Sequence, residues 1–176
     1  MDYKFTKEDL QEIEELKTRY PEVKPVTLPA LWIAQRRFGH VEPEVQRLVA
    51  ETLELPEAHV HGVATFYTQY YKEKKGKYVL DVCTCLSCQL CGGYDILHYL
   101  EEKLGIKKGE TTEDGVFTLN EVECLGACGY APMLQITNDT YVNHLTKEKV
   151  DNLVESLKED KIPEYEKNEM PLRKNN

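Results

Sequence analysis

The sequence predicts an α+β fold in which a small N-terminal helical bundle precedes a domain of strands and helices. Apolar residues recur at helical spacing through roughly the first 70 residues, whereas short β-type runs begin at Tyr78. The charged stretch 72–76 separates the two patterns. We therefore expect a helical bundle over residues 1–75, a mixed domain over 76–160 and a polar C-terminal tail over 161–176.

Four helices are expected in the first part, because each apolar repeat follows residues that commonly start a helix. Asp9 stands three residues after Thr6, which is typical of a capping box, and Gly39 is a suitable residue to end a helix. The predicted helix starts are Thr6, Thr27, Pro43 and Pro56. The residues expected on apolar faces are Phe5, Ile13, Leu16 and Tyr20, then Val45, Leu48, Val49 and Leu53, then Val60, Val63, Ala64 and Tyr67.

The second part alternates between strand and helix signals. A buried strand is expected over 78–82 and another over 116–122, with a helix between them that Gly105 ends. A hairpin follows over 133–142, and Thr146 caps a last helix. The order β-α-β-β-α after a helical front indicates a thioredoxin-like α+β domain.

Composition excludes several classes of function. The net charge of −9 argues against binding to nucleic acid or to an anionic membrane surface. There is no apolar run long enough for a spanning helix, and the N-terminal residues do not resemble a signal peptide. We therefore expect a cytoplasmic protein without direct membrane insertion. Its thiols should stay reduced, which disfavours a disulfide framework.

All six cysteines lie in two short runs, 83–91 and 124–128, and each run follows a predicted strand. Cysteines used only as small apolar side chains would not cluster in this way. Thiolates that bind a metal or an inorganic cluster would, because several must reach one point. Glycines beside both runs allow close approach of the backbone to a ligand. The pattern predicts a shared site beyond the carboxyl ends of the strands.

Spacing alone leaves four alternatives for this site. Cys83 and Cys88 with Cys124 and Cys128 would suit a [2Fe–2S] cluster, with two thiolates on each iron. The run that includes Cys85, Cys88 and Cys91 would suit three corners of a [4Fe–4S] cluster. Two pairs could instead form a zinc site. A C-x-x-C pair on a thioredoxin-like frame would suit a thiol–disulfide oxidoreductase.

The pattern C-x4-C followed by C-x3-C resembles the thioredoxin-like [2Fe–2S] ferredoxin family. Within it, the chain is similar to the 24-kDa-type small iron–sulfur subunits of NADH dehydrogenase, which also occur in NAD-linked and electron-bifurcating hydrogenases and in formate dehydrogenases. The resemblance spans about residues 5–160. The motifs that carry it are Val82-Cys83, Cys88, Glu123 to Cys128, Ala131-Pro132 and, outside the cysteine runs, Val60 to Tyr67.

The resemblance implies that Cys83, Cys88, Cys124 and Cys128 bind one [2Fe–2S] cluster. It also implies an electron-transfer role within an NADH-dependent oxidoreductase, in which the chain exchanges single electrons with the FMN of a larger partner flavoprotein and docks through its helical front. FMN and NAD are expected on that partner, because this chain has no Gly-rich phosphate loop. The family pattern does not require the remaining cysteines, Cys85 and Cys91, which we expect to be loop side chains near the cluster.

Ordinary structural roles are expected for two further groups of residues. The histidines lack ligand spacing relative to the cysteines and are expected in packing or surface roles; they are His40, His59, His61, His98 and His144. The C-terminal tail is expected to fray, with ordering against a partner as the alternative. Its possible anchors are Ile162, Tyr165, Met170 and Leu172.

Overall fold

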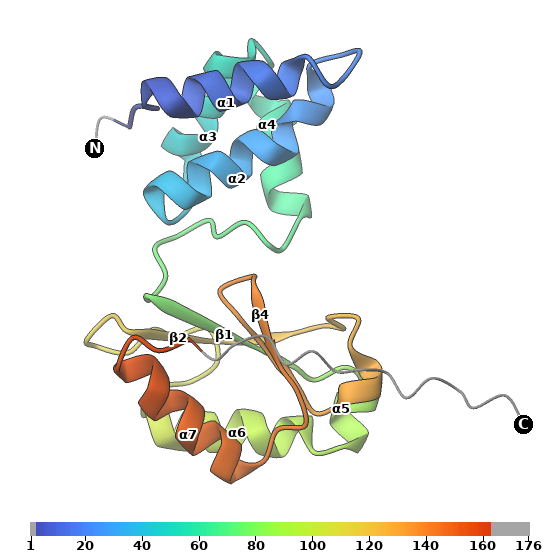
Figure 1. The fold of residues 1–176 in the computed structure, drawn as a ribbon, viewed down its shortest axis with the longest axis vertical. Coiled ribbons are helices and arrows are strands. Elements are labelled where there is room, and N and C mark those ends of the chain that lie inside the picture. The colour runs from blue at the N-terminus through green and yellow to red at the C-terminus, as the bar shows by residue number, and fades with distance from the viewer. Residues whose placement is uncertain (1–2, 163–176) are drawn as a thin grey trace, which may run out of the picture. The chain divides into compact units, whose positions relative to one another are not determined.

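The computed structural model describes residues 3–162 of the chain (Figure 1). The chain divides into two compact units, Met1–Lys75 and Gly76–Asn176. From position 163 onward the predicted tail lies outside the described residues, and so do three of its four possible anchors. None of the helices in the described part combines the length and the apolar character needed to cross a lipid bilayer.

The first unit contains the four predicted α-helices. They are α1 (Lys7–Lys17), α2 (Thr27–Phe38), α3 (Pro43–Leu53) and α4 (Glu57–Phe66), with a short 3-10 turn at Lys24–Val26. The Thr6 hydroxyl accepts a hydrogen bond from the Asp9 amide at 3.3 Å, while the Thr6 amide donates to the Asp9 carboxylate at 3.0 Å. Gly39 ends α2 at a φ of 81°, a conformation that glycine adopts without strain. The predicted helix starts are therefore confirmed.

Two predicted core positions in this unit are wrong. Tyr20 lies beyond the end of α1 and is 41% exposed, and Tyr67 lies beyond the end of α4 and is 39% exposed. Helix α1 stops at Lys17, where the Thr18 side chain and amide both donate to the Glu15 carbonyl and tighten the last turn. The buried core of the unit is otherwise built from the expected faces, including Ile13, Val45, Val49, Leu53, Val60 and Ala64.

The second unit is a four-stranded sheet with helices. Its strands are β1 (Tyr78–Cys83), β2 (Phe117–Val122), β3 (Leu134–Ile136) and β4 (Thr140–Val142). Its helices are α5 (Leu86–Leu90), α6 (Gly93–Leu104) and α7 (Lys147–Lys158), with a 3-10 turn η2 at Cys128–Tyr130. The α+β class is confirmed. The expected β-α-β-β-α order is one strand short, because the predicted hairpin supplies two strands, β3 and β4. The short helix α5, which lies inside the first cysteine run, was not among the predicted elements.

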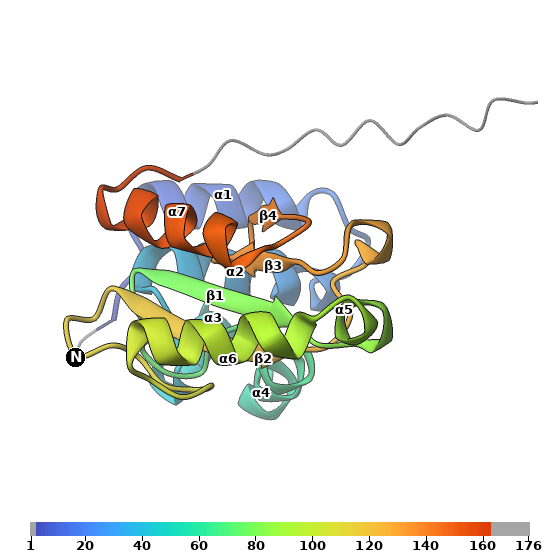
Figure 2. The same cartoon turned by 90° about the horizontal axis from the view of Figure 1, so that it is seen from below.

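The sheet order is β2-β1-β3-β4, and only β1 and β2 run parallel. A parallel pair needs a crossover connection, and α6 supplies it. Helices α6 and α7 cover one face of the sheet (Figures 1 and 2). The apolar core between them includes Leu80, Val82, Leu97, Leu100, Phe117, Leu119, Leu134, Ile136, Val150 and Val154.

Candidate metal centre

The register of the parallel strands brings the two cysteine runs together. Cys83 is the last residue of β1 and pairs with Val122, the last residue of β2, so both chains leave the sheet at the same end. The Cys83 amide donates to the Met133 carbonyl at 3.2 Å, which fixes this end against the approach to β3. We call residues 83–93 the first cysteine loop and residues 124–132 the second.

The first cysteine loop is wound into the interior. Helix α5 begins after Cys85 and ends at Cys91, with the Gln89 amide donating to the Cys85 carbonyl at 2.8 Å. This turn carries Cys88 inward, and Cys83 and Cys88 are each only 2% exposed. Both pack against Met133.

Gly93 closes the first loop and allows a very tight backbone contact. A Cβ atom at this position would lie 2.9 Å from the carbonyl oxygens of both Cys83 and Cys88. Real Cβ atoms essentially never approach backbone so closely. The loop can therefore take this path only because residue 93 has no side chain.

The second cysteine loop lies at the surface. Cys124 and Cys128 are exposed, and their Sγ atoms are 3.3 Å apart. The Gly126 amide donates to the Cys124 sulfur at 3.4 Å, from a backbone with a φ of 80°. The Tyr141 hydroxyl donates to the Leu125 carbonyl at 2.9 Å and ties the loop to strand β4. The turn η2 packs against α5, so the two loops are in contact.

The thiols of the two loops affect one another electrostatically. Burial, and then the neighbouring Cys83 thiol, raise the pKa of Cys88 to about 12. The Gly126 amide, and then the hydrogen bonds from Cys128 and Cys85, lower the pKa of Cys124. The pKa of Cys128 is raised, chiefly by its hydrogen bond to Cys124, although the Ser87 hydroxyl acts in the opposite direction. The exposed pair therefore accommodates a thiolate more easily than the buried thiol does.

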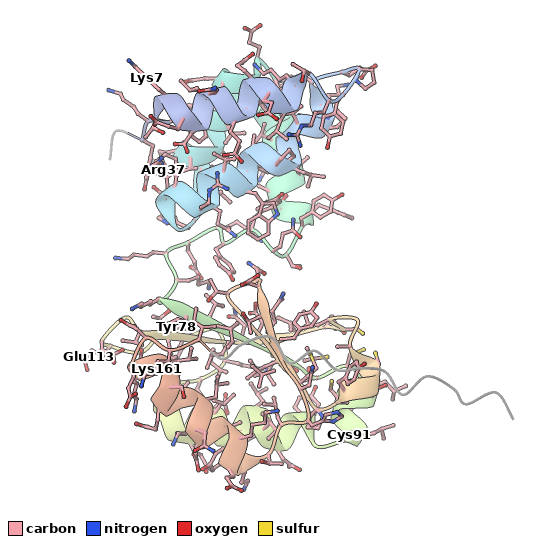
Figure 3. All side chains as sticks on the ribbon, in the orientation of Figure 1. Lys7, Arg37, Tyr78, Cys91, Glu113 and Lys161 are labelled. Atoms are coloured by element: carbon pink, nitrogen blue, oxygen red, sulfur yellow. The ribbon has the colours of Figure 1, made fainter. Side chains whose placement is uncertain are left out.

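The structure thus brings five of the six cysteines together. The predicted ligands form a buried pair, Cys83 with Cys88, and an exposed pair, Cys124 with Cys128. Cys85 lies beside them, within hydrogen-bonding reach of Cys124. Cys91 is exposed at the end of α5, and Figure 3 labels its position.

Two of the histidines that were expected in packing or surface roles lie in the first unit. His59 contacts the Thr27 hydroxyl at 3.3 Å, and His61 contacts the Gln46 side chain at 2.9 Å. Both are therefore engaged with polar partners inside the helical unit.

The spacing of the exposed pair suits two ligands of one tetrahedral metal, whether a zinc ion or one iron of a cluster. Within residues 3–162, no group of three or more His, Cys, Asp or Glu side chains is already close enough to hold a metal ion. Two thiolates on one tetrahedral metal at about 2.3 Å would lie about 3.8 Å apart. The 3.3 Å between Cys124 and Cys128 needs only a small adjustment to reach that spacing.

Three residues that shape the site were not singled out by sequence reasoning. Gly93 was noted only as one of several nearby glycines, because a sequence does not show which backbone atoms it faces. Tyr141 was expected to be an ordinary strand residue, although its hydroxyl forms a hydrogen bond that ties the second loop to β4. Ser87, which hydrogen-bonds to Cys128, carried no signal beyond its place between cysteines.

Comparisons with known proteins agree with this geometry. The family model for thioredoxin-like [2Fe–2S] ferredoxins matches residues 13–158. An E-type component of the NADH-quinone oxidoreductase of Rhizobium meliloti (strain 1021) is 45% identical over 148 residues, which cover 84% of this chain and 88% of that protein. The corresponding NADH-quinone oxidoreductase component of Rickettsia felis is 43% identical over 161 residues, or 90% of this chain and 96% of that protein.

A solved structure shares the fold. The crystal structure of a NAD+-reducing [NiFe]-hydrogenase in the air-oxidized state aligns with a TM-score of 0.64 at 19% identity. The alignment covers 76% of this chain but only 23% of that hydrogenase chain. The family model covers most of the present chain and implies one [2Fe–2S] cluster as cofactor. The chain belongs to the thioredoxin-like [2Fe–2S] ferredoxin family.

Proposed function

We propose that the chain is an electron-transfer subunit whose four thiols, Cys83, Cys88, Cys124 and Cys128, hold one [2Fe–2S] cluster. The observation that carries the proposal is the arrangement of these thiols as two pairs. The pairs come from two loops that leave the sheet at the same end. This division suits two irons with two thiolates each.

The two pairs support different parts of the function. A bound cluster would supply reversible transfer of single electrons. The buried pair anchors it on the side of the core, where Met133 and the sheet exclude water. The Gly126 amide donates to the Cys124 sulfur, and such hydrogen bonds raise the reduction potential of a cluster. The exposed pair is the side from which an electron can arrive or leave.

The partner that we propose is a larger flavoprotein subunit that binds FMN and reacts with NADH or NAD+. The names of the relatives support this choice, because they are subunits of NADH-quinone oxidoreductases. The host complex would be an NADH-quinone oxidoreductase, a soluble NAD-linked or bifurcating hydrogenase, or a formate dehydrogenase. On this proposal the isolated chain carries electrons, and the chemistry of NADH takes place on the partner.

Anaerobic purification tests the cofactor directly. We expect a coloured protein with about two iron atoms and about two acid-labile sulfides per chain, and a one-electron paramagnetic signal after reduction. Zinc without sulfide would instead support an interaction module. A folded, colourless chain without metal, whose thiols cycle between dithiol and disulfide, would support a thiol–disulfide oxidoreductase.

The partner is tested by co-expression with the FMN-containing subunit from the same organism. If the proposal is right, NADH should reduce the cluster in the purified pair but not in the isolated chain. A cluster that forms normally but never accepts electrons from the NADH-reduced partner would contradict the proposed exchange while leaving the cofactor assignment intact.

A further inference from the structure

A carboxylate continues the buried row of side chains along strand β2. Phe117 and Leu119 belong to this row, and both are buried in the core of the sheet unit. Side chains two residues apart in a strand lie on the same face, so Glu121 is the next member of the row. Its side chain is only 23% exposed. A partly buried charge is costly unless it is paired, so the partners of this carboxylate carry information about its role.

The partners of Glu121 come from three separate segments of the chain. The Thr84 hydroxyl donates a hydrogen bond to its carboxylate at 2.9 Å. Lys108, in the connection between α6 and β2, forms an ion pair with it. Tyr94, in the first turn of α6, is a further hydrogen-bonding partner. These donors hold the pKa of the Glu121 carboxyl below its ordinary value, with Lys108 contributing most and Thr84 next.

Two of these partners lie at the ends of the first cysteine loop. Thr84 directly follows Cys83, and Tyr94 is the first residue after the loop. The Thr84 amide also donates to the Val122 carbonyl at 3.1 Å, so its backbone and its side chain are held by the same end of β2. The carboxylate of Glu121 therefore joins the entry and the exit of the first loop to the strand that leads into the second loop.

A second carboxylate of the same unit shows what an ordinary structural ion pair looks like. The side chain of Glu101 is 11% exposed, and it pairs with Lys107. It also accepts a hydrogen bond from the Lys108 amide at 3.0 Å. These partners belong to the connection that follows α6, so Glu101 fastens this connection to the end of its own helix. Glu121 differs because it joins distant segments, one of which carries the proposed ligand Cys83.

We propose that Glu121 is a positioning residue for the first cysteine loop, with Lys108 as its counter-ion. This inference rests on the proposed function and adds a residue outside the ligand set that shapes the site. The hydrogen bond from Thr84 holds the loop that carries the buried pair of thiols. Lys108 balances the negative charge that Glu121 brings to this end of the sheet. The two roles are separable, because a glutamine at position 121 accepts the same hydrogen bond without the charge.

The positioning role is tested by substitution in the cluster-loaded full chain. We expect Glu121→Ala and Thr84→Val each to speed the removal of iron by a chelator about fivefold, because either change frees the loop from β2. The double variant should be no faster than the faster single variant, since both changes remove one shared interaction. Glu121→Gln should stay within about twofold of the wild-type rate. Glu101→Ala is the matched control and should leave the rate unchanged.

The reduction potential of the cluster tests the role of the charges. Reduction adds a negative charge, so the carboxylate of Glu121 opposes it and the ammonium of Lys108 favours it. Glu121→Gln should therefore raise the potential and Lys108→Met should lower it, each by about twofold or more in the equilibrium constant for reduction. The variant with both substitutions should return close to the wild-type value. Potentials that do not move in either single variant would overturn the role of the pair.

Hydrogen exchange in the cluster-free full chain gives a readout that needs no cofactor. Amides of residues 83–93 should exchange faster in Glu121→Ala than in the wild type or in Glu101→Ala. Equal effects of these two substitutions, or additive effects of Glu121→Ala and Thr84→Val, would overturn the inference. If Glu121→Ala does not fold, Thr84→Val carries the same comparison. If the wild-type chain forms no cluster at all, the proposed function fails, and the exchange measurements alone decide whether Glu121 holds the loop.

Discussion

The two units of the molecule differ in how their buried polar groups are satisfied. In the helical unit, Asp9 accepts hydrogen bonds from Arg37 at 2.8 Å and from Thr6, and Gln46 donates to the Val41 carbonyl at 2.6 Å. In the sheet unit, the buried thiols of Cys83 and Cys88 lie chiefly against each other and against Met133. These polar groups of the first unit are satisfied by the unit's own side chains and backbone. In the second unit, four of the sulfurs are the ligands that we propose for a cluster.

The largest expected effect tests whether the four-thiol set is right. Replacing Cys83, Cys88, Cys124 or Cys128 singly by Ser should greatly reduce the cluster content, because serine is a poor replacement for a thiolate ligand. Cys85→Ser and Cys91→Ser should retain the cluster. Iron and sulfide analysis with the visible spectrum measures both groups. Full cluster loss in Cys85→Ser combined with an intact cluster in Cys88→Ser would reassign the ligand to Cys85.

A second substitution tests the backbone that holds the buried pair. Gly93→Ala places a Cβ atom 2.9 Å from two carbonyl oxygens, so the first loop must move. We expect a loss of about 1–3 kcal/mol in the free energy of unfolding of the sheet unit and a lower cluster content. Hydrogen exchange and the visible spectrum measure the two effects. Gly129→Ala is the matched control, since a Cβ atom there meets nothing within 4 Å. Equal losses in both variants would contradict the role assigned to Gly93.

In the helical unit, Asp9 allows a matching test of a buried polar group that needs no cofactor. Burial acts to raise the pKa of Asp9, but the hydrogen bonds from Arg37 and Thr6 outweigh it and hold this pKa below 3.8. The carboxylate therefore stabilises the unit above about pH 4, and this contribution is lost as the pH falls below that value. Asp9→Asn should cost about 1–3 kcal/mol near neutral pH and much less in acid.

Hydrogen exchange in α1 and α2 at several pH values measures the effect of Asp9→Asn. Glu14→Gln is the matched control on the same helix, because Glu14 pairs with Lys17 at the surface, where ion pairs contribute little. A cost that does not shrink in acid would show that Asp9 acts through shape and not through its charge.

The smallest expected effect concerns the exposed pair. Tyr141→Phe removes the hydrogen bond to the Leu125 carbonyl, worth about 1 kcal/mol. The second loop should open more often, and a chelator should then remove iron about fivefold faster. Tyr99→Phe loses a similar hydrogen bond, to Asp151 at 2.8 Å, but at a position in α6. It should leave the rate unchanged, and equal acceleration by both substitutions would show a general loosening of the unit.

Much of the fold follows from short-range signals in the sequence. Helix starts at Thr6 and Thr146 could be predicted because a capping side chain and apolar periodicity coincide there. The candidate site could be predicted because each of the two runs of cysteines follows a predicted strand. Helix α5 could not, because five residues between two cysteines are too few for a period to emerge.

The features that sequence could not supply all depend on distant parts of the chain. The contact between Gly93 and the carbonyls of Cys83 and Cys88 requires the loop to be closed. The proximity of Cys85 to Cys124 joins residues that only the sheet register brings together. The exposure of Leu86 and Leu90 could not be inferred either, since apolar residues are ordinarily expected inside.

The pairing of Cys83 with Val122 sets where the molecule can tolerate a change in length. One residue of a strand spans about 3.3 Å, so a single insertion in β1 or β2 would offset one loop from the other by about the spacing of two sulfurs. It would also reverse the faces of the side chains beyond it. The connection between α6 and β2 lies at the opposite end and does not carry this constraint. Peptide tags or longer linkers are therefore better tolerated in this connection than in β1 or β2.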